Sequence, residues 1–249
     1  MISMRCAAIL MRGAWGEMTQ PKRGRVRHKT HRLIASRHPA IGVFDDLTAD
    51  KGDLRAAFLL EALTNDRHLG LRLNLLPDSE IIPGPSGSLV IAAFLHADAA
   101  GGRFTDGRLG GWYAGFDRDT AIAETLYHNT RRLAFSDVGF PNRIRMREVL
   151  ATIDTELVEL RGLKSACPEL YRDTDYSASQ AFAAGLRWPK SGPAANGIVF
   201  DSVRRPGGMN VCLFWPSQVP LPVVLSGHFE YQWSADGKAS VSKITNIEL

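Results

Sequence analysis

The order of the predicted elements indicates an α+β fold with mixed, mostly antiparallel sheets and short helices. Predicted strands come in hairpins with helices between the groups, not in the regular strand–helix–strand alternation of a parallel sheet. The chain has 249 residues, 45% of them hydrophobic, which suffices for one packed domain or one domain with an appendage. No apolar run approaches the roughly 18 residues of a membrane span, so we expect no membrane contact.

The basic charge of the chain is concentrated at its beginning. The formal net charge is +4, but residues 1–31 hold seven Lys or Arg and one acid, so the remainder carries a net charge of −2. We predict a basic, disordered leader over residues 1–30 and a single domain over 31–249. The run PKRGRVRHK is either an arm for nucleic acid or a partner, or a solvated, disordered tail. A further alternative is that the first codon lies upstream of the real start, which would be Met18.

Two further features of the composition bear on compartment and partners. Cys6, Cys167 and Cys212 are scattered and form no CxxC pair, which predicts a reducing compartment, the cytoplasm, and no zinc site. The leader has a short apolar part interrupted by Arg12 and no small-residue cleavage site, which argues against a secretory signal. The acidic body argues against direct nucleic-acid binding, because phosphate contacts need clustered cations.

In the first half of the chain, the spacing of apolar residues and one capping residue predict the secondary-structure elements. A short apolar segment at residues 32–34 opens the body. Asp53 is suited to cap a helix that continues to residue 63 with apolar groups at helical spacing. A loop rich in proline and glycine follows, and the continuous apolar run LVIAAFLH at residues 89–96 predicts a buried strand.

The second half alternates hairpins and helices. Residues 103–104 and 112–114 flank a glycine-rich turn and predict a hairpin. Asp119 is expected to cap a helix that ends near Leu133, and residues 153–160 alternate like a strand. The remaining predictions are an Ala-rich helix at 177–186, two strands at 198–203 and 210–214 joined by RRPGG, and a hairpin of 229–233 with 240–244 around Ala235-Asp236-Gly237.

Glu124 is the carboxylate best placed for chemistry. On the helix after Asp119 it shares a face with Tyr127, His128 and Arg131 through i+3 and i+4 spacing. The alternative is a solvated stripe in which Glu124 pairs with His128.

Arg103 and Tyr113 are residue types that can hold a nucleotide. Arg103 follows two glycines, which allow close approach of the backbone to a ligand, and its guanidinium suits paired hydrogen bonds to a diphosphate. An arginine in an ordinary turn is the alternative. Tyr113 adjoins Trp112 in a strand, where one of the two faces inward. It is either a core aromatic or a ring that stacks on a base or nicotinamide.

Ser202 ends a strand in which it shares a face with Ile198 and Phe200, so its hydroxyl is directed where apolar groups are directed. No G-x-S-x-G surrounds it, which excludes an esterase elbow. Arg204, Arg205 and Asn210 in and after the next turn either bind an anion or simply make the turn. The chain has no phosphate-loop, H-E-x-x-H or dinucleotide G-x-G-x-x-G motif in the required context.

Taken in order, these segments resemble the RES domain family. The matching segments are HRLIASRHPAIGVFDDL near the start, GRF around Arg103, WYA around Tyr113, TAIAET around Glu124, FPNRIRM, YSASQAFAAGLRW, and GIVFDSVRRPGGMNVCLF around Ser202. The resemblance covers about residues 31–216. Each motif alone is weak, whereas the ordered set is specific.

The resemblance implies both a fold and an activity. RES proteins are similar to ADP-ribosyltransferase folds and are toxins of toxin–antitoxin pairs. They consume NAD as a substrate, by phosphorolysis to nicotinamide and ADP-ribose 1″-phosphate with inorganic phosphate as co-substrate, or by hydrolysis. Some pass ADP-ribose to a protein instead. The implied partner is an Xre-type antitoxin that covers the active site, and no metal or resident cofactor is implied.

The resemblance also assigns roles to residues of this chain. Arg32 and Arg103 would bind the diphosphate and ribose region, and Tyr113 would pack against the nicotinamide. Glu124 would stabilise the oxocarbenium-like ribose, and Ser202 would hydrogen-bond the nicotinamide end or the ribose. Asn210 belongs to the same expected binding set.

This chain departs from the family pattern in two places. Leu33 stands where many members have tyrosine. The stretch from about 45 to 94 is long, which leaves Arg37 as the alternative to Arg32.

Overall fold

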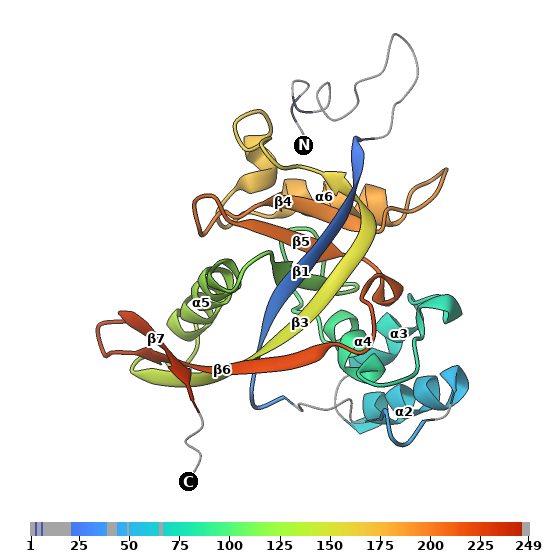
Figure 1. Cartoon of the computed structure of the whole chain (residues 1–249), viewed down its shortest axis with the longest axis horizontal. Coiled ribbons are helices and arrows are strands. Elements are labelled where there is room, and N and C mark those ends of the chain that lie inside the picture. Colours follow the sequence, from blue (N-terminus) through green and yellow to red (C-terminus); the bar gives the residue numbers. More distant parts are fainter. Residues whose placement is uncertain are drawn as a thin grey trace.

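A seven-stranded sheet with helices packed against it forms the described part of the chain (Figure 1). The computed structural model describes residues 3, 6, 21–38, 44–48, 50–64 and 67–245. The strands are β1 (Arg23–Ala35), β2 (Trp112–Gly115), β3 (Asn142–Glu159), β4 (Gly197–Asp201), β5 (Met209–Leu213), β6 (Val224–Trp233) and β7 (Ala239–Ile244). The helices are α2 (Lys51–Thr64), α3 (Arg67–Leu73), α4 (Gly87–Leu95), α5 (Arg118–Ala134) and α6 (Ser177–Arg187), with short 3-10 turns η1 (Asp78–Glu80), η2 (Pro168–Tyr171) and η3 (Pro216–Gln218).

The sheet closes on itself at one end. The strand order is β1-β2-β5-β4-β3-β6-β7, and β1 also pairs with β3 along its whole length. Strands β1, β2, β5, β4 and β3 therefore form a ring, from which β6 and β7 extend. All pairings are antiparallel except the short β3–β4 pair. The predicted α+β class with mostly antiparallel strands is confirmed.

The basic segment at the start of the chain is a strand, so the predicted disordered leader over 1–30 is wrong for residues 23–30. Val26 and Thr30 point into the core, while the charged residues between them face outward. Arg25 pairs with Asp154 at 2.7 Å and Arg23 with Glu156 at 3.7 Å across the β1–β3 pair. The basic run is thus partly neutralised within the sheet, and the expected domain boundary at 31 falls inside β1. Residues 7–20 lie outside the described residues.

Two further predictions were wrong. The apolar run at 89–96 is helix α4 rather than a strand, because a short segment buried on most sides shows no periodicity that separates the two; Val90, Ile91 and Phe94 are fully buried. Residues 103–104 and 112–114 do not form a hairpin. Arg103 lies in a tight turn closed by a Gly102–Thr105 bridge, and β2 pairs with β5 and β1.

The other elements occur where periodicity placed them. Helices α2 and α6, the β4–β5 hairpin and the β6–β7 hairpin agree with prediction within a few residues, apart from an earlier start of β6. Strand β3 begins at Asn142, eleven residues before its predicted start. Helix α5 is capped by Asp117, whose side chain accepts from the backbone N–H of Thr120, and not by Asp119.

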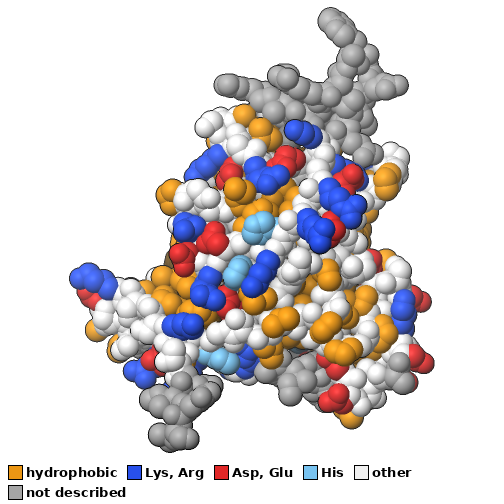
Figure 2. Space-filling view, in the orientation of Figure 1, with side chains coloured by type: hydrophobic (Ala, Val, Ile, Leu, Met, Phe, Trp, Pro, Cys, Tyr) orange, Lys and Arg blue, Asp and Glu red, His pale blue; other side chains and the backbone are white. Residues whose placement is uncertain are grey.

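Three clusters of buried side chains hold these elements together. One joins α2, α3 and α4 to the sheet, one lies beneath η2 and α6, and one lies between α5 and strands β1, β3 and β6. On the face drawn in Figure 2, charged side chains of both signs gather near β1 and β3, whereas hydrophobic side chains gather over the region of α2 to α4. No helix in the described ranges is long and apolar enough to cross a bilayer.

A disulfide joins Cys6 to Cys167, which differs from the expectation of reduced cysteines, while Cys212 is free and buried. The backbone N–H of Ser3 also donates to Glu169 at 2.6 Å. The two contacts join Ser3 and Cys6 to η2 and to the residue that precedes it.

Candidate active site

A cavity of about 960 Å³ opens between β1, β2, α5 and α6. Five of the six predicted site residues line it: Arg32, Arg103, Tyr113, Glu124 and Asn210. Ser202 lies behind Glu124. The fold thus brings the whole predicted set together from segments far apart in the sequence.

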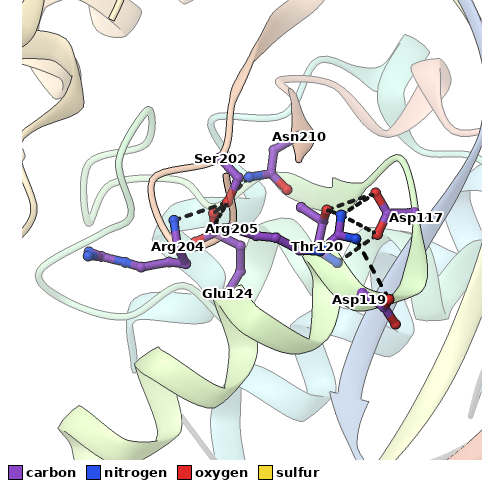
Figure 3. Close-up of polar contacts among 8 residues, drawn as sticks. All are labelled: Asp117, Asp119, Thr120, Glu124, Ser202, Arg204, Arg205 and Asn210. Carbon is purple, nitrogen blue, oxygen red and sulfur yellow. Dashed lines mark hydrogen bonds and ion pairs between the residues drawn. The ribbon is translucent and has the colours of Figure 1, made fainter. Parts of the chain in front are cut away.

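Glu124 is held by two side chains from outside its helix (Figure 3). Its Oε1 accepts hydrogen bonds from the hydroxyl of Ser202 at 2.7 Å and from the side-chain amide of Asn210 at 2.8 Å. The predicted alternative, a solvated stripe in which Glu124 pairs with His128, does not describe this arrangement. Within the described residues no hydrogen bond falls on Oε2.

The hydroxyl of Ser202 has only one direction available for its proton. Its oxygen accepts from the backbone N–H groups of Arg204 at 3.1 Å and Arg205 at 3.0 Å. Two donors use both acceptor lone pairs of a hydroxyl, so the proton is donated to Glu124. Ser202 is 6% exposed. Its side chain lies on the side of Glu124 away from the cavity and holds the carboxylate through this hydrogen bond.

The two arginines of the turn after Ser202 are paired with acids of the chain itself. Arg204 donates to the Asp173 carboxylate at 3.2 Å and stacks 3.4 Å from the centre of the Tyr127 ring. Arg205 donates to both carboxylate oxygens of Asp117 at 3.2 Å (Figure 3). In this arrangement the turn is joined to the start of α5 through Arg205, and both guanidinium groups are ion-paired, although Nε of Arg204 has no hydrogen-bond partner among the described residues.

Arg103 is almost completely buried at the wall of the cavity. One of its terminal nitrogens donates to the carbonyls of Leu170 at 3.1 Å and Arg172 at 2.8 Å, and its guanidinium lies 4.8 Å above the Tyr176 ring. Burial lowers the pKa of Arg103, an effect that the nearby Glu124 opposes. The remaining N–H donors of its planar group are available to a ligand.

Tyr113 is fixed at its hydroxyl. The oxygen accepts from the backbone N–H of Phe104 at 2.9 Å and lies 3.1 Å from the Thr105 hydroxyl. Burial raises the pKa of Tyr113 well above its ordinary value, so the phenol stays neutral. The ring needs Gly102, because a Cβ there would lie 2.8 Å from the Tyr113 oxygen.

Arg32, one of the two candidates for the first arginine of the family pattern, reaches the cavity from β1. Its Nη1 donates to the carbonyl of Tyr113 at 3.0 Å, and its guanidinium lies 4.9 Å above the Trp112 ring. Burial lowers the pKa of Arg32 to about 10, so it is cationic at neutral pH. Arg37, the alternative, is exposed at the end of β1.

Gln180 is a site residue that sequence reasoning missed. Its side-chain amide donates to the carbonyls of Ala100 at 2.8 Å, Gly102 at 3.0 Å and Thr105 at 3.3 Å, and so shapes the loop that carries Arg103. The only signal was a glutamine in the first half of an Ala-rich helix. No cluster of His, Cys, Asp and Glu suited to a metal ion occurs in the part of the chain that the structure describes.

The fold and this site define an α+β protein whose cavity holds one anchored carboxylate beside the buried Arg103 and the half-buried Arg32. The sequence model of the RES domain matches residues 81–234. Because this match spans more than half of the chain, the protein belongs to the RES domain family. The matched range includes Arg103, Tyr113, Glu124 and Ser202, whereas Arg32 precedes it.

Other comparisons add little to this assignment. No curated protein sequence matches the chain. Among solved structures, a chain of the crystal structure of the M. tuberculosis MbcT–MbcA toxin–antitoxin complex matches with 12% identity and a TM-score of 0.41, covering 86% of this chain and 88% of that one.

Proposed function

We propose that this protein is a RES-type toxin that degrades NAD, by phosphorolysis to nicotinamide and ADP-ribose 1″-phosphate or, as the second choice, by hydrolysis. The observation that carries the proposal is the anchored carboxylate of Glu124, bound by Ser202 and Asn210 inside a cavity that also presents Arg32 and Arg103.

The chemistry of the nicotinamide–ribose bond suits a single carboxylate. Cleavage develops positive charge on the sugar, as in other oxocarbenium reactions. A preorganised anion placed where that charge develops stabilises the transition state most strongly. Nicotinamide leaves neutral from a cationic substrate, so no general acid has to protonate it. Glu124 is therefore sufficient, whereas a glycosidase needs two carboxyl groups.

The charge of the cavity supports an anionic acceptor. Among the described residues, four arginines line it against three acids: Arg32, Arg103, Arg131 and Arg132, against Asp98, Glu124 and Asp175. Such a lining suits the substrate diphosphate and an incoming phosphate. Phosphorolysis is placed before hydrolysis because the resemblance to the family implies it, and the cationic lining supports that order. Arg204 and Arg205, for which the sequence left anion binding open, form ion pairs with Asp173 and Asp117 instead.

The proposal extends to a partner and a compartment. By analogy with other RES proteins, an Xre-type antitoxin would cover the cavity and keep the toxin silent, and both proteins would act in the cytoplasm, where NAD is available. Co-expression with the protein encoded beside it should yield a stable complex in which NAD turnover is lost. Turnover at the rate of the free toxin within such a complex would contradict this part.

The decisive experiment is incubation of the purified toxin, free of antitoxin, with NAD in the presence and absence of phosphate, followed by mass analysis of the products. Phosphate-dependent formation of ADP-ribose 1″-phosphate is expected. Free ADP-ribose at a phosphate-independent rate would select hydrolysis, and label transferred from NAD to protein in a lysate would select ADP-ribosyl transfer. Intact NAD under all conditions would exclude the enzyme function.

A Glu124→Gln variant is the matched control for that experiment. The amide oxygen can still accept hydrogen bonds from Ser202 and Asn210, but the negative charge is gone. We expect kcat to fall by about 100-fold or more with an unchanged melting temperature.

A further inference from the structure

A second cavity of about 1230 Å³ adjoins the first. It lies between helices α2 and α4 on one side and strands β1 and β3 on the other. The two cavities share wall residues, among them Arg32, Thr125, His128 and Arg132. They are thus neighbouring compartments with a common, cationic border.

The walls of the second cavity away from that border are largely apolar. Phe44 and Phe58 pack edge to face, with ring centroids 5.2 Å apart, and Leu89 and Val149 line the same space. Apolar and aromatic walls with a few polar groups are typical of sites for flat organic ligands, and aromatic side chains are the usual partners of nucleobases.

The cations at the border are available to an anion. Arg32 is fixed by its hydrogen bond to the Tyr113 carbonyl and by its stacking on Trp112, so its guanidinium is preorganised. Arg132 is exposed, and none of the ion pairs among the described residues includes it. A guanidinium held in place loses little conformational freedom when it binds phosphate oxygens.

The two cavities and the cationic border between them match the three parts of a dinucleotide. Each cavity can hold one nucleoside, and the border can hold the doubly charged diphosphate that joins them. The proposed function places the nicotinamide riboside beside Glu124 in the first cavity. We propose that the diphosphate crosses the border at Arg32 and Arg132, and that the second cavity binds the adenosine half of the substrate. The inference rests on the proposed function and specifies how the substrate lies.

This arrangement assigns a purpose to the long segment from 45 to 94, which departs from the family pattern. That segment contributes α2 and α4, which form one side of the second cavity. The protein would then select NAD through its adenosine half, which takes no part in the reaction. Enzymes commonly use the binding energy of such a non-reacting part of the substrate for catalysis.

Nicotinamide mononucleotide tests the inference, because it contains the scissile bond but lacks the adenylate. The wild-type toxin should use NAD with a kcat/KM at least 100-fold higher than nicotinamide mononucleotide. In an Ala92→Phe variant, which fills the second cavity from α4, this preference should fall at least tenfold through a higher KM for NAD. Ala134→Phe, at an exposed position of α5 outside both cavities, is the matched control and should retain the preference.

Binding of ADP to the inactive Glu124→Gln variant by calorimetry separates this inference from the proposed function. ADP should bind, and the additional Ala92→Phe change should weaken it at least tenfold while the melting temperature stays within a few degrees. Equal use of the two substrates, or unchanged ADP affinity in a folded Ala92→Phe protein, would overturn the subsite. ADP binding without any NAD turnover would leave the subsite standing and refute the enzyme function alone. If Ala92→Phe fails to fold, the smaller Ala57→Leu change on α2 applies the same test.

Discussion

The Ser202 hydroxyl donates its only proton to Oε1 of Glu124 over 2.7 Å, because the backbone N–H groups of Arg204 and Arg205 occupy its oxygen. The serine therefore orients the carboxylate instead of facing the cavity. This geometry separates two roles that a sequence motif cannot separate, contact with the substrate and support of the residue that contacts it.

Replacement of Ser202 by alanine should lower kcat for NAD by up to about 100-fold, because a reactive group that is misplaced by about 1 Å loses a factor of this order, with little change in KM. It should also cost about 1–3 kcal/mol of stability, since two backbone N–H groups lose their acceptor. Steady-state kinetics and denaturant unfolding measure the two effects. Ser202→Thr keeps the hydroxyl and should recover most of kcat. A raised KM with unchanged kcat in Ser202→Ala would instead indicate direct contact with the substrate.

Gly102→Ala should displace the Tyr113 ring, because the added Cβ would lie 2.8 Å from the phenol oxygen and 3.1 Å from Cζ. We expect KM for NAD to rise more than tenfold, together with a loss of stability of about 1–3 kcal/mol from overpacking. Gly185→Ala is the matched control, since nothing lies within 4 Å of a Cβ at that position in α6. It should raise stability by about 0.5–1 kcal/mol and leave the kinetics alone. Similar kinetics for the two variants would contradict the packing argument.

The buried carboxylate of Glu148 should make the fold less stable as the pH falls into the acid range. Burial alone would raise the pKa of Glu148, but hydrogen bonds from Arg118, His31 and Ser226 lower it to about 2, from 4.5 for a free side chain. The stabilisation is complete above pH 4.5 and is lost as the pH falls toward 2, and its size is about 3 kcal/mol.

Denaturant unfolding of the wild-type protein between pH 5 and pH 2.5 measures this loss. A Glu148→Gln variant should be less stable at pH 7 but should show a flatter dependence on pH in this range. An equally steep dependence in that variant would assign the acid sensitivity to other carboxylates.

The disulfide between Cys6 and Cys167 should contribute about 2–5 kcal/mol to stability, because it closes a loop of 161 residues in the unfolded chain. Reductant should lower the melting temperature of the wild-type protein and leave that of Cys6→Ser unchanged. Insensitivity of the wild-type protein to reductant would show that the bond contributes nothing to the fold.

The sequence predicted the members of the site better than their arrangement. Arg103, Tyr113 and Glu124 follow one another in this order within one segment, and the motif around Ser202 completed the predicted set of site residues. The direction of the Ser202 hydroxyl depends on two backbone amides of the following turn, which no side-chain pattern reveals. Gln180 was missed because the three carbonyls that accept hydrogen bonds from its side chain lie 75 to 80 residues earlier in the chain.

The fold class followed from the hairpins, whereas two elements were misassigned for opposite reasons. The segment 89–96 is apolar at almost every position, so neither period stands out and length alone did not decide between helix and strand. In the first part of β1 only Val26 and Thr30 are buried, and the three residues between them are all exposed. The segment therefore has no clear alternation of apolar and polar residues, and its net charge indicated a solvated tail instead of a strand.

The ring of strands fixes when activity can arise during synthesis. Arg32 lies on β1, which docks on β3 more than a hundred residues later, and Tyr113 on β2 is paired with β5. Ser202 and Asn210 are made later still. A growing chain therefore has no complete cavity until Asn210 on β5 has left the ribosome, so any activity of the site can begin only when most of the chain has been synthesised.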